Sequence, residues 1–247
     1  MSRTIVVSGG GSGIGRAVAS SFAADGDEVV IVGRREALLQ EVAAEITAGS
    51  AGRVAAHACD LRAPDAVAEL GERLVREHGA VDVVVNAAGS SNSAPRSDLR
   101  EIDAVWDADF RSNVMTAVLL TSALVGALRR PGGRVIAVSS ISALRGGAGS
   151  YSAAKAALHG WVYALAGELA TEGITVNAIA PGYTGGTGIF GDSLTEEGDS
   201  RRIAETLVGR AGLPGEIAAG IRYLASEDAA FVTGEILHVN GGAVFGR

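Results

Sequence analysis

The stretch TIVVSGGGSGIG, residues 4–15, decides the fold class of this 247-residue chain. Four β-branched residues lead into Ser8, a glycine-rich turn follows, and a helix-like segment begins at once. Such a turn presents backbone N–H groups at a helix N-terminus, where a pyrophosphate binds, and glycine lets the phosphates approach the backbone. An ordinary tight turn is the alternative, but the position between a first strand and a first helix favours a dinucleotide site. Its expected residues are Gly9, Ser12, Gly13, Ile14 and Gly15.

Outward from this turn, short β-branched runs alternate with longer Ala- and Leu-rich segments, the pattern of a parallel sheet with helices on both faces. We predict one domain over residues 1–247 with a three-layer, Rossmann-like α/β fold and a doubly wound parallel sheet of about seven strands. The predicted strands are Ile5–Ser8, Val29–Val32, Val54–Cys59, Val81–Asn86, Val135–Ser139, Thr175–Ala180 and Ile236–Val239. The predicted helices cover residues 14–24, 36–47, 64–78, 101–128, 151–171, 200–208 and 214–226. The segment Gly182–Ser200 is expected to be a long loop that acts as a lid.

Composition excludes several classes of function. The 21 basic and 28 acidic residues give a net charge of −7, so we expect no binding to nucleic acid or to an anionic membrane. No apolar run reaches the roughly 18 residues of a membrane helix. The first strand leaves no room for a signal peptide, and a lone cysteine, Cys59, fits a reducing compartment, so we expect a cytoplasmic protein. No metal site is expected, because metal-ligand spacing is absent among His57, His78, His159 and His238.

The end of the second predicted strand, Gly33-Arg34-Arg35, bears on the choice of dinucleotide. A site selective for NAD carries an acidic residue here that binds the ribose hydroxyls. Gly33 instead leaves room for a 2′-phosphate, and Arg34 can pair with it bidentately. The alternative is that both arginines are solvated at a helix start. The pattern favours NADP(H) over NAD(H).

Two further strand ends are candidate cofactor contacts. Asp60 follows the third strand, where its carboxylate would accept the adenine amine, and Leu61 adjoins it; alternatively, Asp60 is the N-cap of the helix that starts at Pro64. The fourth strand ends in small residues that would let the backbone approach the cofactor. These are Asn86, Ala87, Ala88 and Gly89.

Tyr151 and Lys155 are the candidate catalytic pair. They lie four residues apart in a helix-like segment, so their side chains share one face. An ammonium about 4 Å away favours a phenolate by about 4 kcal/mol at an effective dielectric of 20. We therefore expect the pKa of Tyr151 to be lowered, so that it serves as general acid in reduction or base in oxidation. Ser139 and Ser140 end the fifth strand at the same sheet edge.

These motifs, in this order, resemble the short-chain dehydrogenase/reductase family over essentially the whole chain. Further matches are Asn113, Asn177, Pro181-Gly182 and Val239-Asn240-Gly241-Gly242. The resemblance implies a homo-oligomer, a tetramer or dimer, in which Tyr151 donates a proton and Ser140 binds the substrate oxygen. It also implies that Lys155 tunes Tyr151 and holds the nicotinamide ribose, while Asn113 supports a water-linked proton relay to Lys155.

This chain departs from the family pattern at three places. In the turn after the fourth strand, Ala87 or Ala88 replaces a second asparagine that is often seen there, which is a mild change. The segment between Ser140 and Tyr151 is about two residues shorter than in most members, which leaves Ser139 as an alternative hydroxyl. After Pro181 and Gly182 the usual threonine is displaced, so Thr184 or Thr187 would contact the carboxamide, with Thr187 favoured.

The leading hypothesis is an NADP(H)-dependent enzyme that reduces a ketone, of which a 3-oxoacyl thioester is the commonest family precedent, to a secondary alcohol. The alternatives are a secondary-alcohol, sugar or steroid dehydrogenase working oxidatively, and a non-catalytic dinucleotide-binding protein. Residues expected to line an apolar substrate pocket are Ile189, Phe190 and Leu194. Acyl carrier protein is a weakly supported partner, because the basic cluster that would bind it equally fits a solvated helix end; the cluster comprises Arg129, Arg130 and Arg134.

Overall fold

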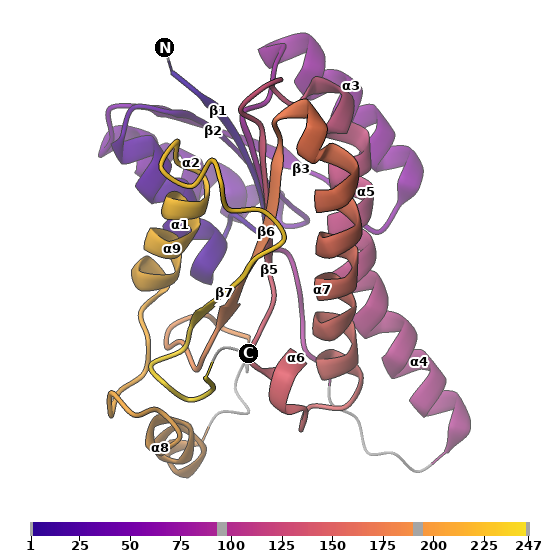
Figure 1. The fold of residues 1–247 in the computed structure, drawn as a ribbon, viewed down its shortest axis with the longest axis vertical. Helices are drawn as coiled ribbons and strands as arrows, with labels where there is room; N and C mark the ends of the chain where they lie inside the picture. The colour runs from indigo at the N-terminus through magenta and orange to yellow at the C-terminus, as the bar shows by residue number, and fades with distance from the viewer. Residues whose placement is uncertain (1, 93–97, 190–194, 246–247) are drawn as a thin grey trace.

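The computed structural model describes residues 2–92, 98–189 and 195–245. Its centre is a seven-stranded, entirely parallel sheet with the strand order β3-β2-β1-β4-β5-β6-β7 (Figure 1). Strand order reverses between β1 and β4, and ligands of doubly wound sheets bind at this switch point, beyond the carboxyl ends of the strands. The strands are β1 (Thr4–Ser8), β2 (Glu28–Gly33), β3 (Arg53–Ala58), β4 (Val83–Asn86), β5 (Arg134–Val138), β6 (Thr175–Pro181) and β7 (Ile236–Val239).

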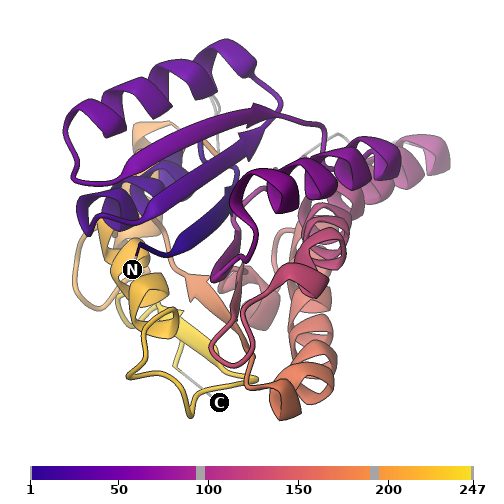
Figure 2. The same ribbon diagram turned by 90° about the horizontal axis from the view of Figure 1, so that it is seen from above.

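Helices cover both faces of the sheet, which gives three layers (Figures 1 and 2). One face carries α1 (Gly13–Ala24), α2 (Glu36–Ala48) and α9 (Pro214–Leu224). The other carries α3 (Pro64–His78), α4 (Leu99–Phe110), α5 (Thr116–Leu124) and α7 (Ser150–Leu169). Two shorter helices, α6 (Ser142–Arg145) and α8 (Glu196–Ala204), lie beyond the carboxyl ends of the strands (Figure 1).

The central strands are apolar on both sides because both sides are covered. In β1, Ile5 and Val7 pack against α1 and α9, whereas Val6 faces the layer of α3 and α5. All three are fully buried. Because successive residues of this β-branched run face the two cores in turn, the middle of the first strand, Ile5 to Val7, has no polar position.

The predicted fold class is confirmed, and most predicted elements match the observed ones within two residues. Two differences concern local structure. The predicted strand Val81–Asn86 is shorter, because Val81 forms only an isolated bridge to Leu128 before β4 begins at Val83. The expectation of a continuous loop over Gly182–Ser200 is wrong, because Thr195 caps α8, which begins at Glu196. The helix predicted at 200–208 is therefore shifted toward the N-terminus.

The predicted helix 101–128 is a helical stretch, residues 99–127, with a change of geometry in its middle. A π-helical turn (Arg111–Met115) separates α4 from α5, and a 3₁₀ turn (Val125–Ala127) ends the stretch. By length and composition this stretch could cross a membrane. It contains the fully buried carboxylate of Asp109, however, and α5 packs on α3 and β4 in the core, so it is a helix of the folded layer.

Candidate active site

The glycine turn after β1 is packed so closely that side chains do not fit. A Cβ at Gly15 would lie 2.3 Å from the carbonyl oxygen of Gly9, and Gly13 has a φ of +52°. Ser12, the N-cap of α1, makes no side-chain capping hydrogen bond. The first-turn N–H groups of α1 are thus presented at a helix start with no Cβ atoms in front of them, as an anion requires.

The turn at the end of β4 lies directly against the glycine turn. The Ser8 hydroxyl accepts hydrogen bonds from the N–H groups of Ala87 and Ala88, both at 3.0 Å. A Cβ at Gly9 would lie 2.9 Å from the Ala87 carbonyl oxygen. The amide nitrogen of Asn86 donates to Thr121 Oγ1 at 2.9 Å. The structure thus brings together the two small-residue turns that the sequence placed at the switch point.

Ser140 and Tyr151 meet at the carboxyl end of β5. The Ser140 hydroxyl lies beside the Tyr151 phenol and lowers the pKa of that phenol by hydrogen bonding, and Ser140 Oγ accepts the N–H of Ser142 at 3.1 Å. The hydroxyl of Ser139 points elsewhere: it donates to the Lys155 carbonyl at 3.2 Å and lies 2.7 Å from His159 Nε2. Of the two serines, the geometry therefore places Ser140 beside the phenol.

Lys155 and Asn113 converge on Gly89. A Cβ at Gly89 would lie 2.6 Å from Asn113 Oδ1 and 3.3 Å from Lys155 Nζ. The Lys155 ammonium donates to the carbonyl of Val138 at 2.8 Å, and the amide of Asn113 donates to the carbonyl of Ser90 at 2.7 Å. The π-helical turn that carries Asn113 is a type of irregularity frequent at functional sites, and it aims this side chain inward.

Asp109 is a residue of this site that the sequence analysis missed. Its side chain is fully buried. One carboxylate oxygen accepts the Ser150 hydroxyl at 2.6 Å, and the other accepts the backbone and side-chain N–H groups of Asn92 at 3.1 and 2.8 Å. Its carbonyl accepts the Asn113 amide at 2.9 Å. The sequence signal was weak: Asp109 lies one helical turn before Asn113, but it is one of several charged residues in the same helix.

The electrostatics of the pair differ from the sequence-based expectation. Burial raises the pKa of Tyr151 to about 12, against a smaller lowering by the hydrogen bond from Ser140. The predicted lowering by Lys155 is wrong for the protein alone. Lys155 Nζ is 5.6 Å from the centroid of the Tyr151 ring and is directed at the Val138 carbonyl. Burial also lowers the pKa of Lys155 to about 8, while Asp109 favours its charged form.

The residues expected to bind the adenosine half of the cofactor make contacts that differ in part from the predicted ones. The Arg35 guanidinium reaches the Ser12 hydroxyl at 3.4 Å, so it lies nearer the glycine turn than sequence analysis indicated. Asp60 forms a 2.6 Å ion pair with Arg62, and hydrogen bonding from Arg62 lowers the pKa of the Asp60 carboxyl to about 2. Asp60 is not the N-cap of α3, because Ala63 holds that position. Leu61 is 3% exposed and packs into the core, so its side chain does not face the site.

The turn after β6 closes the other side of the site. The carbonyl of Pro181 accepts the N–H of Ile141, which ties this turn to the segment after Ser140. A Cβ at Gly182 would lie 2.7 Å from Asn240 Cα. Thr184 donates to the Gly182 carbonyl at 3.1 Å. The backbone of Thr187 lies against Gly13, where a Cβ would come within 3.0 Å of its carbonyl oxygen. Thr187 is thus the threonine that reaches the glycine turn.

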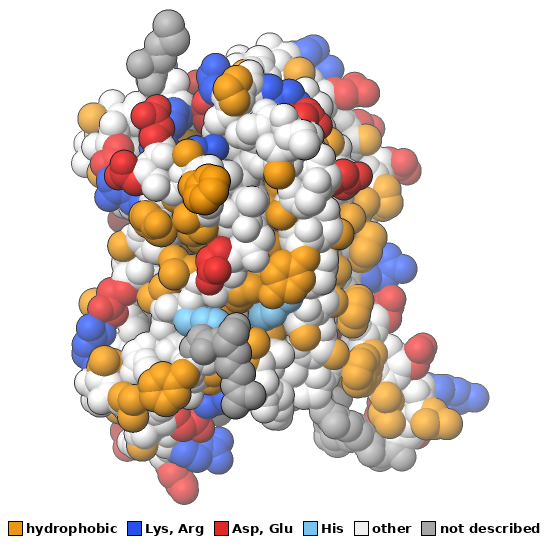
Figure 3. Space-filling view, in the orientation of Figure 1, with side chains coloured by type: hydrophobic (Ala, Val, Ile, Leu, Met, Phe, Trp, Pro, Cys, Tyr) orange, Lys and Arg blue, Asp and Glu red, His pale blue; other side chains and the backbone are white. Residues whose placement is uncertain are grey.

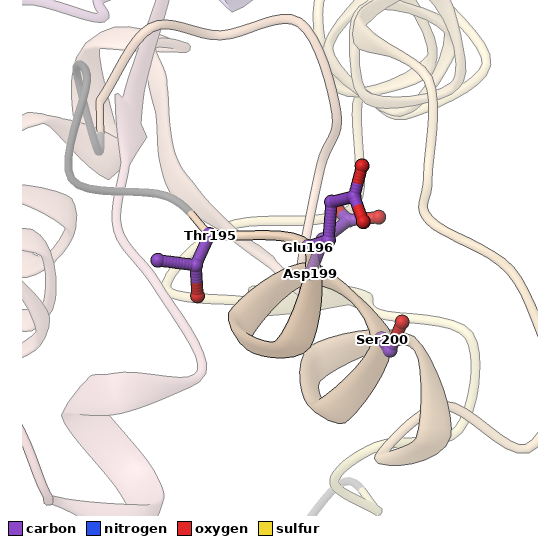
Figure 4. Close-up of a pocket in the computed structure, with 4 residues that line it drawn as sticks. All are labelled: Thr195, Glu196, Asp199 and Ser200. Carbon is purple, nitrogen blue, oxygen red and sulfur yellow. The ribbon is translucent and has the colours of Figure 1, made fainter.

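The segment beyond this turn is anchored over the carboxyl edge by polar contacts. Arg145 of α6 forms a 2.7 Å ion pair with Glu205, just after α8, and the Tyr183 hydroxyl is hydrogen-bonded to Asp199. Figure 4 shows an open, acidic hollow at the first turns of α8, lined by Thr195, Glu196, Asp199 and Ser200. Of the predicted pocket residues, Ile189 is partly buried, whereas Phe190 and Leu194 lie outside the described residues.

These observations fit a nicotinamide dinucleotide. The glycine turn presents backbone N–H groups at the start of α1, and among the described residues the buried oxygens Asn86 Oδ1 and Asn113 Oδ1 have no hydrogen-bond partner. Buried polar atoms need a partner, which a ligand or a bound water supplies. The Ser140 hydroxyl, the Tyr151 phenol and the Lys155 ammonium lie together at the same sheet edge. Fold and site together define a dinucleotide-binding oxidoreductase of the Rossmann class.

Comparison with known proteins specifies the family. Residues 9–244 match the family described as Enoyl-(Acyl carrier protein) reductase. The short-chain reductase protein NovJ of Streptomyces niveus is 39% identical over 96% of this chain and 92% of its own length. The 3-oxoacyl-[acyl-carrier-protein] reductase FabG of Escherichia coli is 34% identical over 96% and 95%. A short-chain dehydrogenase/reductase structure from Brucella melitensis superposes with a TM-score of 0.90 at 30% identity, covering 99% of this chain and 97% of that one. The chain belongs to the short-chain dehydrogenase/reductase family.

Proposed function

We propose that the protein is a cytoplasmic, NADPH-dependent reductase that converts the ketone of a 3-oxoacyl thioester to a secondary alcohol. The observation that carries this proposal is that the Ser140 hydroxyl, the Tyr151 phenol and the Lys155 ammonium lie together at the same sheet edge as the glycine turn. The alternative of a non-catalytic binding protein gives no reason to bury a phenol, a hydroxyl and an ammonium together.

The bound cofactor supplies a hydride, and the protein handles the substrate oxygen. In this proposal the Ser140 and Tyr151 hydroxyls hydrogen-bond that oxygen, and Tyr151 gives it a proton as negative charge develops. Lys155 holds the nicotinamide ribose and favours the phenolate that remains. Asn113, with an unpartnered buried oxygen near Lys155 Nζ, positions a water that restores the proton.

At a pKa of about 12 the Tyr151 phenol is protonated at neutral pH, which is the form that a proton donor starts from. The same group serves as base in the reverse reaction, so this pKa does not distinguish the two directions. The reductive direction is proposed from the names of the relatives.

The proposed cofactor contacts lie at the glycine turn that opens α1, at the arginines that follow β2, and at Thr187. The N-terminus of α1, from Gly13 to Gly15, holds the pyrophosphate, and Arg34 and Arg35 bind the 2′-phosphate of NADPH. Both arginines are exposed beyond β2. Arg35 is tethered to Ser12, and Arg34 acts electrostatically on Asp60. The carboxamide contact is assigned to Thr187, next to Gly13.

The proposal of a 3-oxoacyl thioester as substrate rests on the names of the relatives and not on a surface feature of this chain. FabG is named for this reaction, and a 33% identical relative from Allochromatium vinosum is named acetoacetyl-CoA reductase. The basic cluster does not support a docking surface for a carrier protein, which was one of its two interpretations. Arg129 pairs with Asp82 and Arg130 with Glu172, Arg134 is 5% exposed, and β5 begins there, at the sheet edge opposite the site. On the face in Figure 3, basic and acidic side chains are interspersed.

We further propose that the protein is a homo-oligomer. Large apolar side chains along the α4–α5 stretch are partly exposed, with 42% for Trp106, 37% for Phe110 and 37% for Met115. A shared apolar helix face is the common basis of symmetric association. Light scattering of the purified protein should give a dimer or tetramer, and a monomer at working concentration would contradict this part of the proposal.

The test of function is a comparison of cofactors and substrates. Purified protein should oxidise NADPH with acetoacetyl-CoA, and much more slowly with NADH. Tyr151→Phe should bind NADPH, followed by fluorescence, with turnover reduced by about three orders of magnitude. Oxidation of sugar alcohols with NAD as the only activity, or unchanged turnover in Tyr151→Phe, would refute the proposal.

A further inference from the structure

A second cluster of polar side chains lies between β3 and the last turn of α3, separate from the candidate active site. His57 comes from β3, and Glu77 and His78 are the last two residues of α3. One ligand atom from each side chain lies within 4.8 Å of the other two. No local pattern predicts this grouping, because twenty positions lie between the two histidines and neighbouring helix residues do not share a face.

The distances in the cluster are close to those of a coordination sphere. Glu77 Oε2 lies 3.6 Å from His57 Nε2 and 3.9 Å from His78 Nε2. In a tetrahedral site with metal–ligand bonds of about 2.0–2.1 Å, ligand atoms are spaced by about 3.3–3.4 Å. The ligand atoms of His57 and His78 lie within 4.8 Å of each other, so side-chain rotation would bring all three atoms to that spacing.

His78 is the residue that points to a ligand. Its side chain is 8% exposed, and its Nε2 atom is buried with no hydrogen-bond partner among the described residues. Its other ring nitrogen, Nδ1, lies 3.3 Å from Glu28 Oε1. A carboxylate that accepts a hydrogen bond from Nδ1 keeps the ring proton on that nitrogen. The lone pair of Nε2 then points at the cluster, as is usual for metal-bound histidines.

Charges around the cluster favour a cation. Glu77 and Glu28 contribute two carboxylates, and the Arg73 guanidinium is the cation that acts on His57. Two imidazoles and a carboxylate suit zinc and its neighbours in the first transition row, whereas calcium and magnesium prefer oxygen ligands. We propose that His57, Glu77 and His78 form a binding site for a divalent transition metal, with Zn²⁺ the best-matched ion and water as fourth ligand.

The site would join the end of α3 to β3, the edge strand of the sheet. Glu28 of β2 would be a positioning residue that fixes the His78 ring. A metal that binds the folded protein only raises its melting temperature with concentration, because ligation shifts the folding equilibrium. Stability and metal binding are therefore the relevant readouts.

The experiment uses full-length protein without an affinity tag, stripped with chelator and titrated with Zn²⁺ by calorimetry and with Co²⁺ by visible absorption. Wild type should bind one ion per chain, with a Co²⁺ spectrum of four-coordinate N/O ligation and a raised melting temperature. Glu77→Gln changes an exposed side chain and should fold normally, yet bind at least about tenfold more weakly. Glu28→Gln should weaken binding by about 10–100-fold. His57→Ala should abolish the Co²⁺ spectrum.

The matched control is Glu72→Gln, which removes an exposed carboxylate from the same helix, paired only with Arg76 at 3.6 Å in the described contacts. Its affinity for Zn²⁺ should equal that of wild type. Absence of binding to wild type would overturn the proposal. Binding that is unchanged in both Glu77→Gln and His57→Ala would also overturn it, because the ion would then lie elsewhere.

Discussion

The Asp109 carboxylate accepts a hydrogen bond from the Ser150 hydroxyl at 2.6 Å, and this contact joins the two helices that carry the site. Asp109 precedes Asn113 by one helical turn, and Ser150 precedes Tyr151 directly. The carboxylate also favours the ammonium form of Lys155. Asp109 thus helps to position the helices that carry Asn113 and Tyr151, and its charge acts on Lys155.

We expect Asp109→Asn to lower activity mainly at alkaline pH. The amide keeps the shape and a hydrogen bond toward Ser150, but it removes the negative charge that supports the Lys155 ammonium. The alkaline limb of kcat/KM for NADPH, which reports the free enzyme, should move to lower pH. A loss of about three- to tenfold at pH 8 with little change at pH 6.5 is expected. Ser150→Ala, which keeps the charge, should leave the position of that limb unchanged; equal displacement in both variants would contradict a role through charge.

The two neighbouring serines should respond differently to removal of their hydroxyls. Ser140→Ala takes away the group that bonds Tyr151 and should lower kcat by about 10²–10³-fold. Ser139→Ala should keep turnover within a few-fold and lose about 1 kcal/mol of unfolding free energy, because its hydroxyl serves the Lys155 carbonyl and His159. The reverse order of turnover would assign Ser139 to the substrate.

Gly33→Asp should reverse the cofactor preference. A Cβ at Gly33 meets nothing closer than the Leu39 methyl groups at 3.7 Å, so the fold accepts the change. The new carboxylate repels a 2′-phosphate and accepts bonds from ribose hydroxyls. The ratio of kcat/KM for NADPH to that for NADH should fall by about 100-fold or more. Gly33→Ala, the control for size, should retain the NADPH preference, and an unaltered ratio in Gly33→Asp would place the 2′-phosphate elsewhere.

Lys155→Met should change the dependence of stability on pH. Burial lowers the pKa of Lys155 from 10.5 to about 8, so between these values the unfolded chain binds more protons than the folded one. Wild-type stability therefore rises with pH across this window, while both states are charged below pH 8. The contribution amounts to about 3 kcal/mol. Urea unfolding should show Lys155→Met losing about that much stability relative to wild type between pH 7 and pH 10.5; parallel curves would show that the folded ammonium is well solvated.

Sequence reasoning located the elements because their signals are local. The glycine turn, the β-branched runs and the Tyr151–Lys155 spacing each depend on neighbours within one turn or strand. The same reasoning missed Asp109 and misjudged the phenol, because burial and the direction of the Lys155 ammonium depend on β5 and α4, which are remote in sequence. It could not choose between a docking patch and a solvated helix end for Arg129 and Arg130, since their partners Asp82 and Glu172 are brought close only by folding.

The amino-acid sequence by itself determined the parallel sheet, the placement of a site at its carboxyl edge and the Tyr151–Lys155 pair, because periodicity and turn chemistry are properties of short segments. Tertiary structure alone decided that Ser140 rather than Ser139 meets Tyr151, that Asp109 is buried beneath them, and that His57 reaches His78. These are distances between segments far apart in the chain. They are set by how whole layers pack, and no local pattern encodes them.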